Sequence, residues 1–315
     1  MLTVENLSLD PFYNQAFEEF VYQTFTEDDV FLLWRNRPAV VVGRYQNICR
    51  EVHAADLLRR GIPVVRRMTG GGTVYHDPGN VNYTYITQTG GQLDYDAVLA
   101  PVIAALRALG IPARKDRVCD IAIGDRKISG SAQRLVKGRL LHHGTLLFSS
   151  DLAMLDKITT HRKNDGFQSK GTPSAICAVT NIRDHLTQPM TLAQFQAGLL
   201  AQMVPAGGRR LTLTPEQEAQ VRRLRDEKYR TWAWTWGKTP PFTYEKTGVF
   251  AGEPIRIAYG AKGGMVSGAA VDCPALDGAL AAELLNGARL EPEGFAAICR
   301  RLAGDRAEEL LDLLM

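Results

Sequence analysis

The sequence lacks the long hydrophobic runs and the cysteine motifs that mark membrane and disulfide-rich proteins. No uninterrupted apolar run reaches the roughly 18 residues that a membrane-spanning helix needs. The five cysteines are odd in number, widely spaced and without a Cys-X-X-Cys pair, which argues against a disulfide framework and a zinc ribbon. Residues 1–15 have neither the basic segment nor the apolar core of a signal peptide. We therefore expect a cytoplasmic protein with reduced thiols and no membrane partner.

A strong charge of one sign is also absent. Thirty-seven Lys and Arg residues against 34 Asp and Glu residues leave a formal net charge of +3, and the basic residues form no arm or tail. Charge therefore gives no reason to expect a nucleic-acid partner. The 45% hydrophobic and 23% charged residues are typical of a globular protein, and 315 residues correspond to about two domains.

Helical and strand periodicities come in separate runs, which predicts an α+β fold. Asp10 followed by proline has the form of a helix start, and an apolar stripe continues to about Phe25. Turn-forming residues at 36–38 favour an antiparallel hairpin of 30–35 with 39–43. Further strands are expected at 64–67, 73–76, 81–87, 120–123, 127–131 and 140–148, the first three as a meander around glycines, and further helices at 53–60, 96–109, 191–203 and 214–230.

The C-terminal quarter is predicted to be a separate module. Gly237–Pro241 contains two successive prolines, which are typical of a hinge between domains. We place the boundary there, with a large domain at 1–239 and a small α+β domain at 240–315. Just before the hinge, three tryptophans alternate as in a strand, at 232, 234 and 236. Residues 159–174 are polar and aperiodic, which predicts a long mobile loop of the kind that closes over a site.

A glycine-rich segment is the first candidate for binding. Arg66 and Arg67 precede three successive glycines, Gly70–Gly72. Glycines let a ligand approach the backbone N–H groups, and guanidinium groups pair with phosphate or carboxylate. An ordinary glycine-rich bend has the same sequence features, and no helix start follows to make a dinucleotide fingerprint.

The segment around Lys127 is the second candidate. If strand alternation holds, Lys127, Ser129 and Ser131 share one face and place an ammonium group beside two hydroxyls. Such a lysine could neutralise charge that develops on a phosphoryl group. A solvated surface lysine is the alternative, because most lysines lie at the surface.

Three other motifs give weaker evidence for a function. His142 and His143 are adjacent on an expected strand and point to opposite faces, so they cannot supply two ligands to one metal ion. Gly237-Lys238-Thr239 resembles the end of a phosphate-binding loop, but the required earlier glycine is Trp232 and a proline follows. Cys119 is the best-placed thiol for nucleophilic catalysis, although no histidine lies nearby in sequence.

Together these segments resemble one family. The order and spacing of RRMTGGGTVYHDPGN, GDRKISGSAQ, HHGTLL and KYRTWAWTWGKTPPF are similar to those of the lipoate-protein ligase A family, and DPFYNQAFEE, WRNRPAVVVGRYQN and VTNI agree. The resemblance covers nearly the whole chain. It implies a mixed-sheet domain like that of class II aminoacyl-tRNA synthetases and biotin ligases, followed by a small α+β accessory domain.

The resemblance also implies an activity. Lipoate and ATP would give lipoyl-AMP and pyrophosphate, and the lipoyl group would then pass to a lysine of an apo carrier. The implied partners are the lipoyl domains of 2-oxoacid dehydrogenase complexes and the glycine-cleavage carrier protein. ATP and Mg²⁺ are expected as co-substrate and metal, and no tightly bound organic cofactor is expected.

Site residues follow from the family's motifs. Lys127 would contact the lipoate carboxylate and the α-phosphate, and Asp120 would position the metal or the attacking amine. An apolar slot near Val42, Gly43 and His76 would take the acyl chain. The implied lipoate and adenylate contacts are Arg67, Met68, Gly70, Gly71, Gly72, Thr73, Val74, Tyr75, His76, Lys127 and His143.

The chain departs from the family pattern at several positions. Cys119 replaces a common Asn, Met68 replaces a common Ser, and Ile176 and Ala178 stand where the family commonly has arginines. If those arginines hold pyrophosphate or the carrier, Ile176→Arg should improve activity.

Two other functions stay open at this point. An octanoyl- or lipoyl-transferase of the same fold uses no ATP and works through a cysteine thioester, which would make Cys119 essential. A catalytically silent lipoate-binding protein is the second alternative. A biotin ligase is disfavoured because its basic glycine-arginine loop is absent.

Overall fold

A mixed eight-stranded sheet forms the largest unit of the computed structural model, which describes residues 1–158, 166–175 and 177–315. Its order is β12-β1-β2-β6-β10-β9-β8-β7, with β1 parallel to β2 and β12 and the other neighbours antiparallel. The strands are β1 (Leu2–Val4), β2 (Val30–Trp34), β6 (Asn80–Gln88), β7 (Arg114–Lys115), β8 (Asp120–Ile123), β9 (Arg126–Val136), β10 (Arg139–Leu147) and β12 (Arg209–Leu211).

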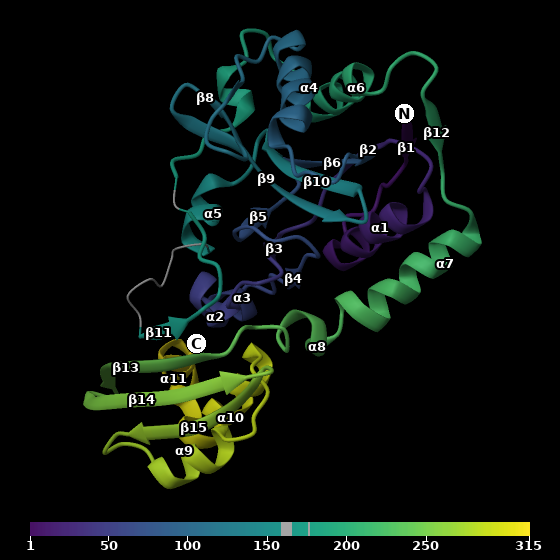
Figure 1. Ribbon diagram of the computed structural model, residues 1–315. Coiled ribbons are helices and arrows are strands. Elements are labelled where there is room, and N and C mark those ends of the chain that lie inside the picture. The colour runs from purple at the N-terminus through teal and green to yellow at the C-terminus, as the bar shows by residue number, and fades with distance from the viewer. Residues whose placement is uncertain (159–165, 176) are drawn as a thin grey trace.

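Helices cover both faces of this sheet (Figure 1). On one face, α4 (Tyr95–Ala108) and α6 (Leu192–Met203) pack their apolar residues against Phe31, Tyr83 and Leu146. On the other, α1 (Pro11–Thr24) and α7 (Pro215–Leu224) share a core with Leu32 and Leu141. The expected helix starts are confirmed, because the side chains of Asp10 and Thr214 accept backbone N–H groups of the first turns of α1 and α7.

A second, three-stranded sheet packs between the large sheet and the C-terminal unit. Its central strand β3 (Ala39–Val42) is parallel to β4 (Val64–Arg66) and antiparallel to β5 (Val74–His76). The parallel crossover from β3 to β4 runs through α2 (Ile48–Glu51) and α3 (Ala54–Arg59). The three glycines lie in the loop between β4 and β5.

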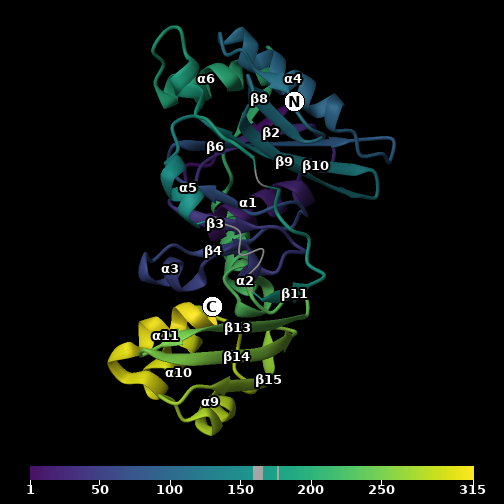
Figure 2. The same cartoon turned by 90° about the vertical axis from the view of Figure 1, so that its left-hand side faces the viewer.

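The C-terminal unit lies at one end of the molecule in both views (Figures 1 and 2). Its four-stranded sheet has the order β11-β13-β14-β15, and helices pack against it. The elements are β11 (Phe167–Ser169), β13 (Phe242–Phe250), β14 (Glu253–Lys262), β15 (Met265–Asp272), α9 (Gly278–Leu285), α10 (Pro292–Ala303) and α11 (Ala307–Leu314). One hydrophobic cluster joins this unit to the three-stranded sheet, with Val42 and Phe250 among its members.

The expected hairpin and meander are wrong. β2 and β3 belong to different sheets, and the connection between them is anchored by the buried Asn36 side chain, which contacts Asn14 and His76. β4 and β5 both pair with β3 rather than with each other, and β6 lies in the large sheet. Turn-forming residues show where a strand ends, whereas strand partners depend on distant residues.

The expected strand at the tryptophans is also wrong. Residues 232–235 form the short helix α8 (Trp232–Thr235), because Thr231 caps its first turn by accepting from the Trp234 N–H. The indoles of Trp232 and Trp234 donate to the carbonyls of Leu290 and Arg66, so the alternation reflects two separate neighbours. Part of the expected 159–174 loop, residues 159–165, lies outside the described residues, and the rest contains β11, which pairs with β13.

The remaining short elements are α5 (Leu152–Ile158), two 3-10 helices at Ile182–His185 and Gly304–Arg306, and a π-helix at Arg225–Tyr229 that continues α7. In the part of the chain that the structure describes, none of the helices is both long and apolar enough to cross a membrane.

Candidate active site

A cavity of about 300 Å³ lies between the large sheet and the glycine loop. Exposed residues, Arg117, Val118 and Ala175, mark its open end. At its other end the lining side chains are almost fully buried, with Trp34 2% and His76 3% exposed. The cavity thus runs from an exposed mouth at Arg117 to a part lined by buried residues, which we call its closed end, as in many small-molecule sites.

Lys127 and Asp120 form an ion pair in the wall of this cavity. Nζ of Lys127 lies 2.8 Å from Oδ1 of Asp120, and Asp120 is only 4% exposed. The two residues come from neighbouring antiparallel strands, β9 and β8. The Lys127 backbone is held from its other side as well, since its N–H donates to the Ala178 carbonyl and its carbonyl accepts from the Thr180 N–H.

The expected alternation along β9 is interrupted. Ala122 faces Lys127 and Ile121 faces Ser129, so Ile128 is an extra residue that makes a bulge. Consequently Ser129 is fully buried away from the cavity, while Lys127, Gly130 and Ser131 line it. The prediction that Lys127, Ser129 and Ser131 share one face is wrong, because the bulge at Ile128 breaks the alternation between Lys127 and Ser129.

Arg67 shapes the glycine loop from inside. Its Nη2 donates to the carbonyls of Gly70 and Gly72 at 2.6 and 2.7 Å, and its Nη1 donates to the Val41 carbonyl at 3.1 Å. Burial lowers the pKa of this guanidinium from 12.5 to about 10, so it stays charged at neutral pH. Gly71 has φ of 83°, which glycine adopts without strain.

Arg66 has a structural role instead of the expected anion-binding one. Its guanidinium donates to the carbonyls of Gly43, Arg44, Gln46 and Thr235 and to the Thr239 hydroxyl. These bonds tie the three-stranded sheet to α8 and to the segment before β13. Arg66 does not contribute to the cavity lining.

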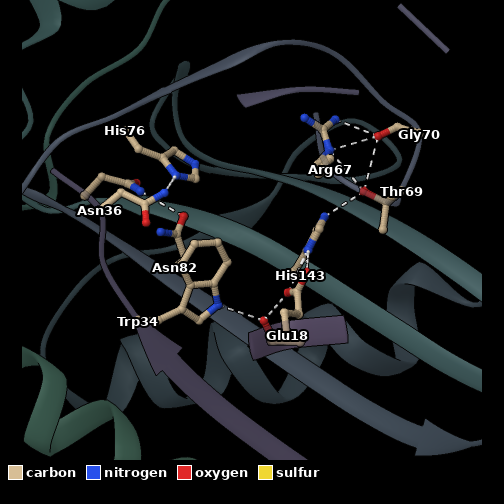
Figure 3. A network of polar contacts seen from close by, with 11 residues as sticks. Glu18, Trp34, Asn36, Arg67, Thr69, Gly70, His76, Asn82 and His143 are labelled. Carbon is tan, nitrogen blue, oxygen red and sulfur yellow. Dashed lines mark hydrogen bonds and ion pairs between the residues drawn. The ribbon is translucent and has the colours of Figure 1, made fainter. Parts of the chain in front are cut away.

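A chain of polar contacts links α1 to the glycine loop (Figure 3). Both carboxylate oxygens of Glu18 lie 2.9 Å from Nδ1 of His143, and Nε2 of His143 lies 2.7 Å from Oγ1 of Thr69. A carboxylate only accepts, so in the neutral ring Nδ1 carries the proton and Nε2 accepts from the Thr69 hydroxyl. Thr69 also accepts from Nε of Arg67 at 3.0 Å. Glu18 therefore fixes both His143 and the loop.

A second network of hydrogen bonds joins Ser174 to the glycine loop. Ser174 donates to the buried carboxylate of Glu51 and accepts from the Thr73 N–H at 2.8 Å. Gln46 donates to Ser174 at 3.0 Å and accepts from the Thr73 hydroxyl at 2.9 Å. These bonds attach the segment after β11 to the glycine loop, and Ser174 is one of the residues that line the cavity.

Most of the expected site residues line the cavity. They are Arg67, Gly71, Gly72, Thr73, Val74, His76, Asp120, Lys127 and His143. Three do not, since Met68 and Tyr75 are buried in hydrophobic clusters and Gly70 faces the Tyr45 ring. Val42 and Gly43, expected in the acyl slot, lie outside the lining, whereas their neighbour Val41 is part of it.

Several lining residues were missed from the sequence. They are Gln15, Trp34, Asn82, Arg117 and Ser174. Gln15 and the nearby Glu18 lie among apolar residues in α1, a helix expected to serve the core alone. Polar residues beside an apolar stripe indicate a solvated face unless the partner is known, so no local signal identified them.

Cys119 lines the cavity but has poor properties for a nucleophile. Its Sγ lies 3.6 Å from Oδ1 of Asp120. Burial and then the charge of Asp120 raise the pKa of this thiol, which favours the unreactive protonated form. Ile176, the proposed site of a restored arginine, falls outside the described residues.

The acidic groups present suit a magnesium ion that is held mainly by substrate phosphates. The described residues contain no group of three or more His, Cys, Asp or Glu side chains that could hold a metal ion unaided. Mg²⁺ at nucleotide sites commonly takes one or two carboxylates and completes its shell with phosphate oxygens and water. The carboxylate of Asp120, in the cavity wall, fits that requirement.

Comparison with known proteins agrees with this geometry. Residues 10–204 match the model of the lipoyl protein ligase A/B catalytic domain. The chain is 35% identical to lipoate-protein ligase 1 of Staphylococcus aureus over 268 residues, which cover 83% of this chain and 81% of that protein. It is also 34% identical to the lipoate-protein ligase LplJ of Bacillus subtilis, over 77% of this chain and 75% of that one.

Solved structures share the fold. A Thermoplasma acidophilum protein with bound lipoic acid superposes with a TM-score of 0.62 at 26% identity, over 74% of this chain and 98% of that one. Lipoate-protein ligase A bound with ATP gives a TM-score of 0.61 at 26% identity, over 74% and 97%. The expected α+β, class II synthetase-like and biotin-ligase-like architecture is confirmed, and the chain belongs to the lipoate-protein ligase A/B family.

Proposed function

We propose that this protein activates lipoate with ATP to form lipoyl-AMP and then transfers the lipoyl group to a lysine of an apo carrier domain. One observation carries the proposal. The Lys127–Asp120 pair lies in the wall of a blind cavity whose other wall is the glycine loop. A long acid fits into such a slot with its carboxylate at the ion pair, where the nucleotide can approach from the open end.

The first step brings two anions together. A carboxylate oxygen of lipoate attacks the α-phosphorus of ATP, a P–O bond forms, and pyrophosphate leaves. The Lys127 ammonium offsets the repulsion between carboxylate and α-phosphate, and such a preorganised charge is worth about 3 kcal/mol or more in the transition state. Asp120 would hold Mg²⁺, which supplies further positive charge to the phosphates.

The glycine loop positions the activated acid. Arg67 draws the carbonyls of Gly70 and Gly72 inward. The N–H groups of such a loop are free to turn towards the acyl-phosphate. His143 is held by Glu18 and lines the same cavity, where it keeps the acyl chain in place.

The second step is an acyl transfer. The ε-amine of the carrier lysine, in its neutral form, attacks the carbonyl carbon of lipoyl-AMP, an amide bond forms, and AMP leaves. Asp120 is the carboxylate in the cavity wall that can position this amine. No covalent intermediate with the enzyme is required, and Cys119 has no part in it.

The carriers that this chemistry fits are apo lipoyl domains of 2-oxoacid dehydrogenase complexes and the glycine-cleavage carrier protein, modified in the cytoplasm. We propose no nucleic-acid partner, because the protein has a net charge of only +3.

Pyrophosphate release tests the proposal. Wild type and Lys127→Ala would be incubated with Mg-ATP, with and without lipoate, in the absence of carrier protein. We expect lipoate-dependent release by wild type and at least a hundredfold slower release by Lys127→Ala. Lys262→Ala, on the surface of β14, is the matched control and should behave as wild type. No release by wild type would favour the ATP-independent transferase or the silent binding protein.

A further inference from the structure

Three buried polar atoms at the closed end of the cavity have no hydrogen-bond partner among the described residues. They are Oε1 of Gln15, Nε2 of His76 and Nδ2 of Asn82. Their residues are 1%, 3% and 2% exposed, and all three line the cavity. Native proteins pair nearly all such atoms, because an unpaired buried polar group costs about 1–3 kcal/mol. Three in one cavity indicate that a ligand completes them.

The proton on His76 can be assigned from its neighbours. Nδ2 of Asn14 donates to the carbonyls of Ser8 and Arg35, which fixes the orientation of that amide. The same Nδ2 donates to Oδ1 of Asn36 at 2.7 Å, so the Asn36 group that faces Nδ1 of His76, at 2.9 Å, is its NH₂. Nδ1 must accept, and the proton lies on Nε2. Burial lowers the pKa of His76 to about 3, which keeps the ring neutral.

The closed end therefore presents two hydrogen-bond donors, in addition to the acceptor Oε1 of Gln15. His76 offers Nε2–H, and Asn82 offers its NH₂ group, since its Oδ1 already accepts from Nδ2 of Asn80 at 2.9 Å. Figure 3 shows His76, Asn36, Asn82 and the Trp34 ring gathered in one group, apart from Arg67, Thr69 and Gly70. Apolar surface from Trp34, Val41 and Val74 also lines the cavity.

The distance from these donors to the ion pair follows from the sheet. Asn82 pairs with Thr145 across β6 and β10, and Oγ1 of Thr145 accepts from the Gly130 N–H on β9. Gly130 in turn pairs with Asp120 on β8. Three steps between strands, each about 4.8 Å, place Asn82 about 14 Å from Asp120. An extended eight-carbon acid has a comparable length, so an acid whose carboxylate reaches Lys127 ends at the donors.

We infer that the closed end selects acyl substrates that carry a hydrogen-bond acceptor, sulfur or oxygen, at their far end, and that the donors of Asn82 and His76 set this selectivity. The inference rests on the proposed function. A plain alkyl chain such as octanoate leaves both donors unpaired when it displaces water from this end. The dithiolane of lipoate brings two sulfur acceptors to the same place.

A comparison of lipoate with octanoate as substrates tests the inference. The ratio of kcat/KM for lipoate to that for octanoate would be measured by pyrophosphate release in wild type, Asn82→Leu and Gln15→Leu. We expect the ratio to fall about tenfold in Asn82→Leu, because lipoate loses a donor while octanoate gains an apolar contact. Gln15→Leu removes an acceptor that cannot pair with sulfur, so it should not lower the ratio. 8-Hydroxyoctanoate should lose as much as lipoate in Asn82→Leu.

A ratio within one preparation does not depend on how much protein is folded. Ser150→Ala is the matched control and should keep the wild-type ratio. The buried hydroxyl of Ser150 is likewise unpartnered among the described residues, but it lies outside the cavity lining. Pyrophosphate release with an unchanged ratio in Asn82→Leu, or with an equal fall in Gln15→Leu, would overturn the inference alone. Absence of release with any acid would remove the proposed function and the inference together.

Discussion

A Cβ atom on Gly130 would lie 2.7 Å from Nζ of Lys127 and 2.9 Å from its Cε. The lysine side chain thus lies directly over the glycine on its way to Asp120. Real Cβ atoms do not approach other atoms so closely, so any larger residue at position 130 has to displace the lysine. The bulge at Ile128 and the glycine two residues later act together to aim Lys127 into the cavity.

Gly130→Ala should therefore disable the site without removing any catalytic group. We expect the rate of lipoate-dependent pyrophosphate release to fall about ten- to a hundredfold, because Lys127 loses its position beside Asp120. Gly90→Ala is the matched control, since a Cβ there meets no atom within 4 Å. Equal rates for the alanine variant and wild type would show that the lysine has room elsewhere.

Glu18 should matter for stability more than its place in a core helix suggests. Glu18→Ala leaves His143 and Thr84 without their acceptor, and the Thr84 hydroxyl donates to Glu18 at 2.6 Å. We expect the free energy of unfolding in urea to fall by about 2–4 kcal/mol. The exposed Glu283 on α9 provides the comparison, and Glu283→Ala should change the same quantity by less than about 0.5 kcal/mol.

Acid should destabilise the protein through its buried histidines. Burial is the main reason that the pKa values of His76 and His142 fall from 6.5 to about 3. Below pH 6.5 the unfolded chain therefore binds protons that the folded chain does not, and stability falls as the pH falls towards 3. Each histidine should remove on the order of 2 kcal/mol between pH 7 and pH 5.

The contribution of one histidine can be isolated by substitution. His142 does not line the cavity and contacts Gln133 and Tyr83. Urea unfolding of His142→Gln at the two pH values should show a loss of stability smaller by about 2 kcal/mol than that of wild type. Parallel pH dependences for the two proteins would mean that this ring is not neutral in the folded state.

Cys119→Ser should separate the ligase from a thioester-forming transferase. The pKa of the Cys119 thiol is raised, and its Sγ lies beside the Asp120 carboxylate, so the thiol is not activated as a nucleophile. We expect the variant to keep pyrophosphate release within about threefold of wild type, since Ser is a close isostere. A complete loss of lipoyl transfer to carrier with adenylation intact would instead place the thiol on the reaction path.

Local signals in the sequence were sufficient for helix starts and for the main binding segments. Asp10 and Thr214 cap helices through bonds to their own first turns, so a few neighbouring residues determine the outcome. The glycine loop and Lys127 were recognised for the same reason, since each lies in a short run with special chemistry.

Features that depend on distant partners were not predictable in this way. Trp34 and Ala39 are close in sequence, but they enter different sheets because each strand pairs with remote residues. Arg66 and Arg67 are adjacent arginines with different roles. Arg66 donates to a carbonyl of α8, whereas Arg67 donates to carbonyls of the glycine loop and fixes its conformation. Glu18 could not be distinguished from a solvated helix residue until His143, on β10, was placed beside it.

The pairing of β11 with β13 has a consequence for how the protein can be divided. The ring centroids of Phe167, on β11, and Tyr244, on β13, lie 4.4 Å apart. Ser174, which follows the end of β11 by five residues, lies in the cavity wall. A truncation at the predicted boundary, residue 239, would leave β11 as an unpaired edge with its aromatic side chain uncovered. The C-terminal unit thus supports the segment that forms part of the cavity wall. A fragment that ends before this unit should therefore be assayed as a different protein rather than as an isolated catalytic half.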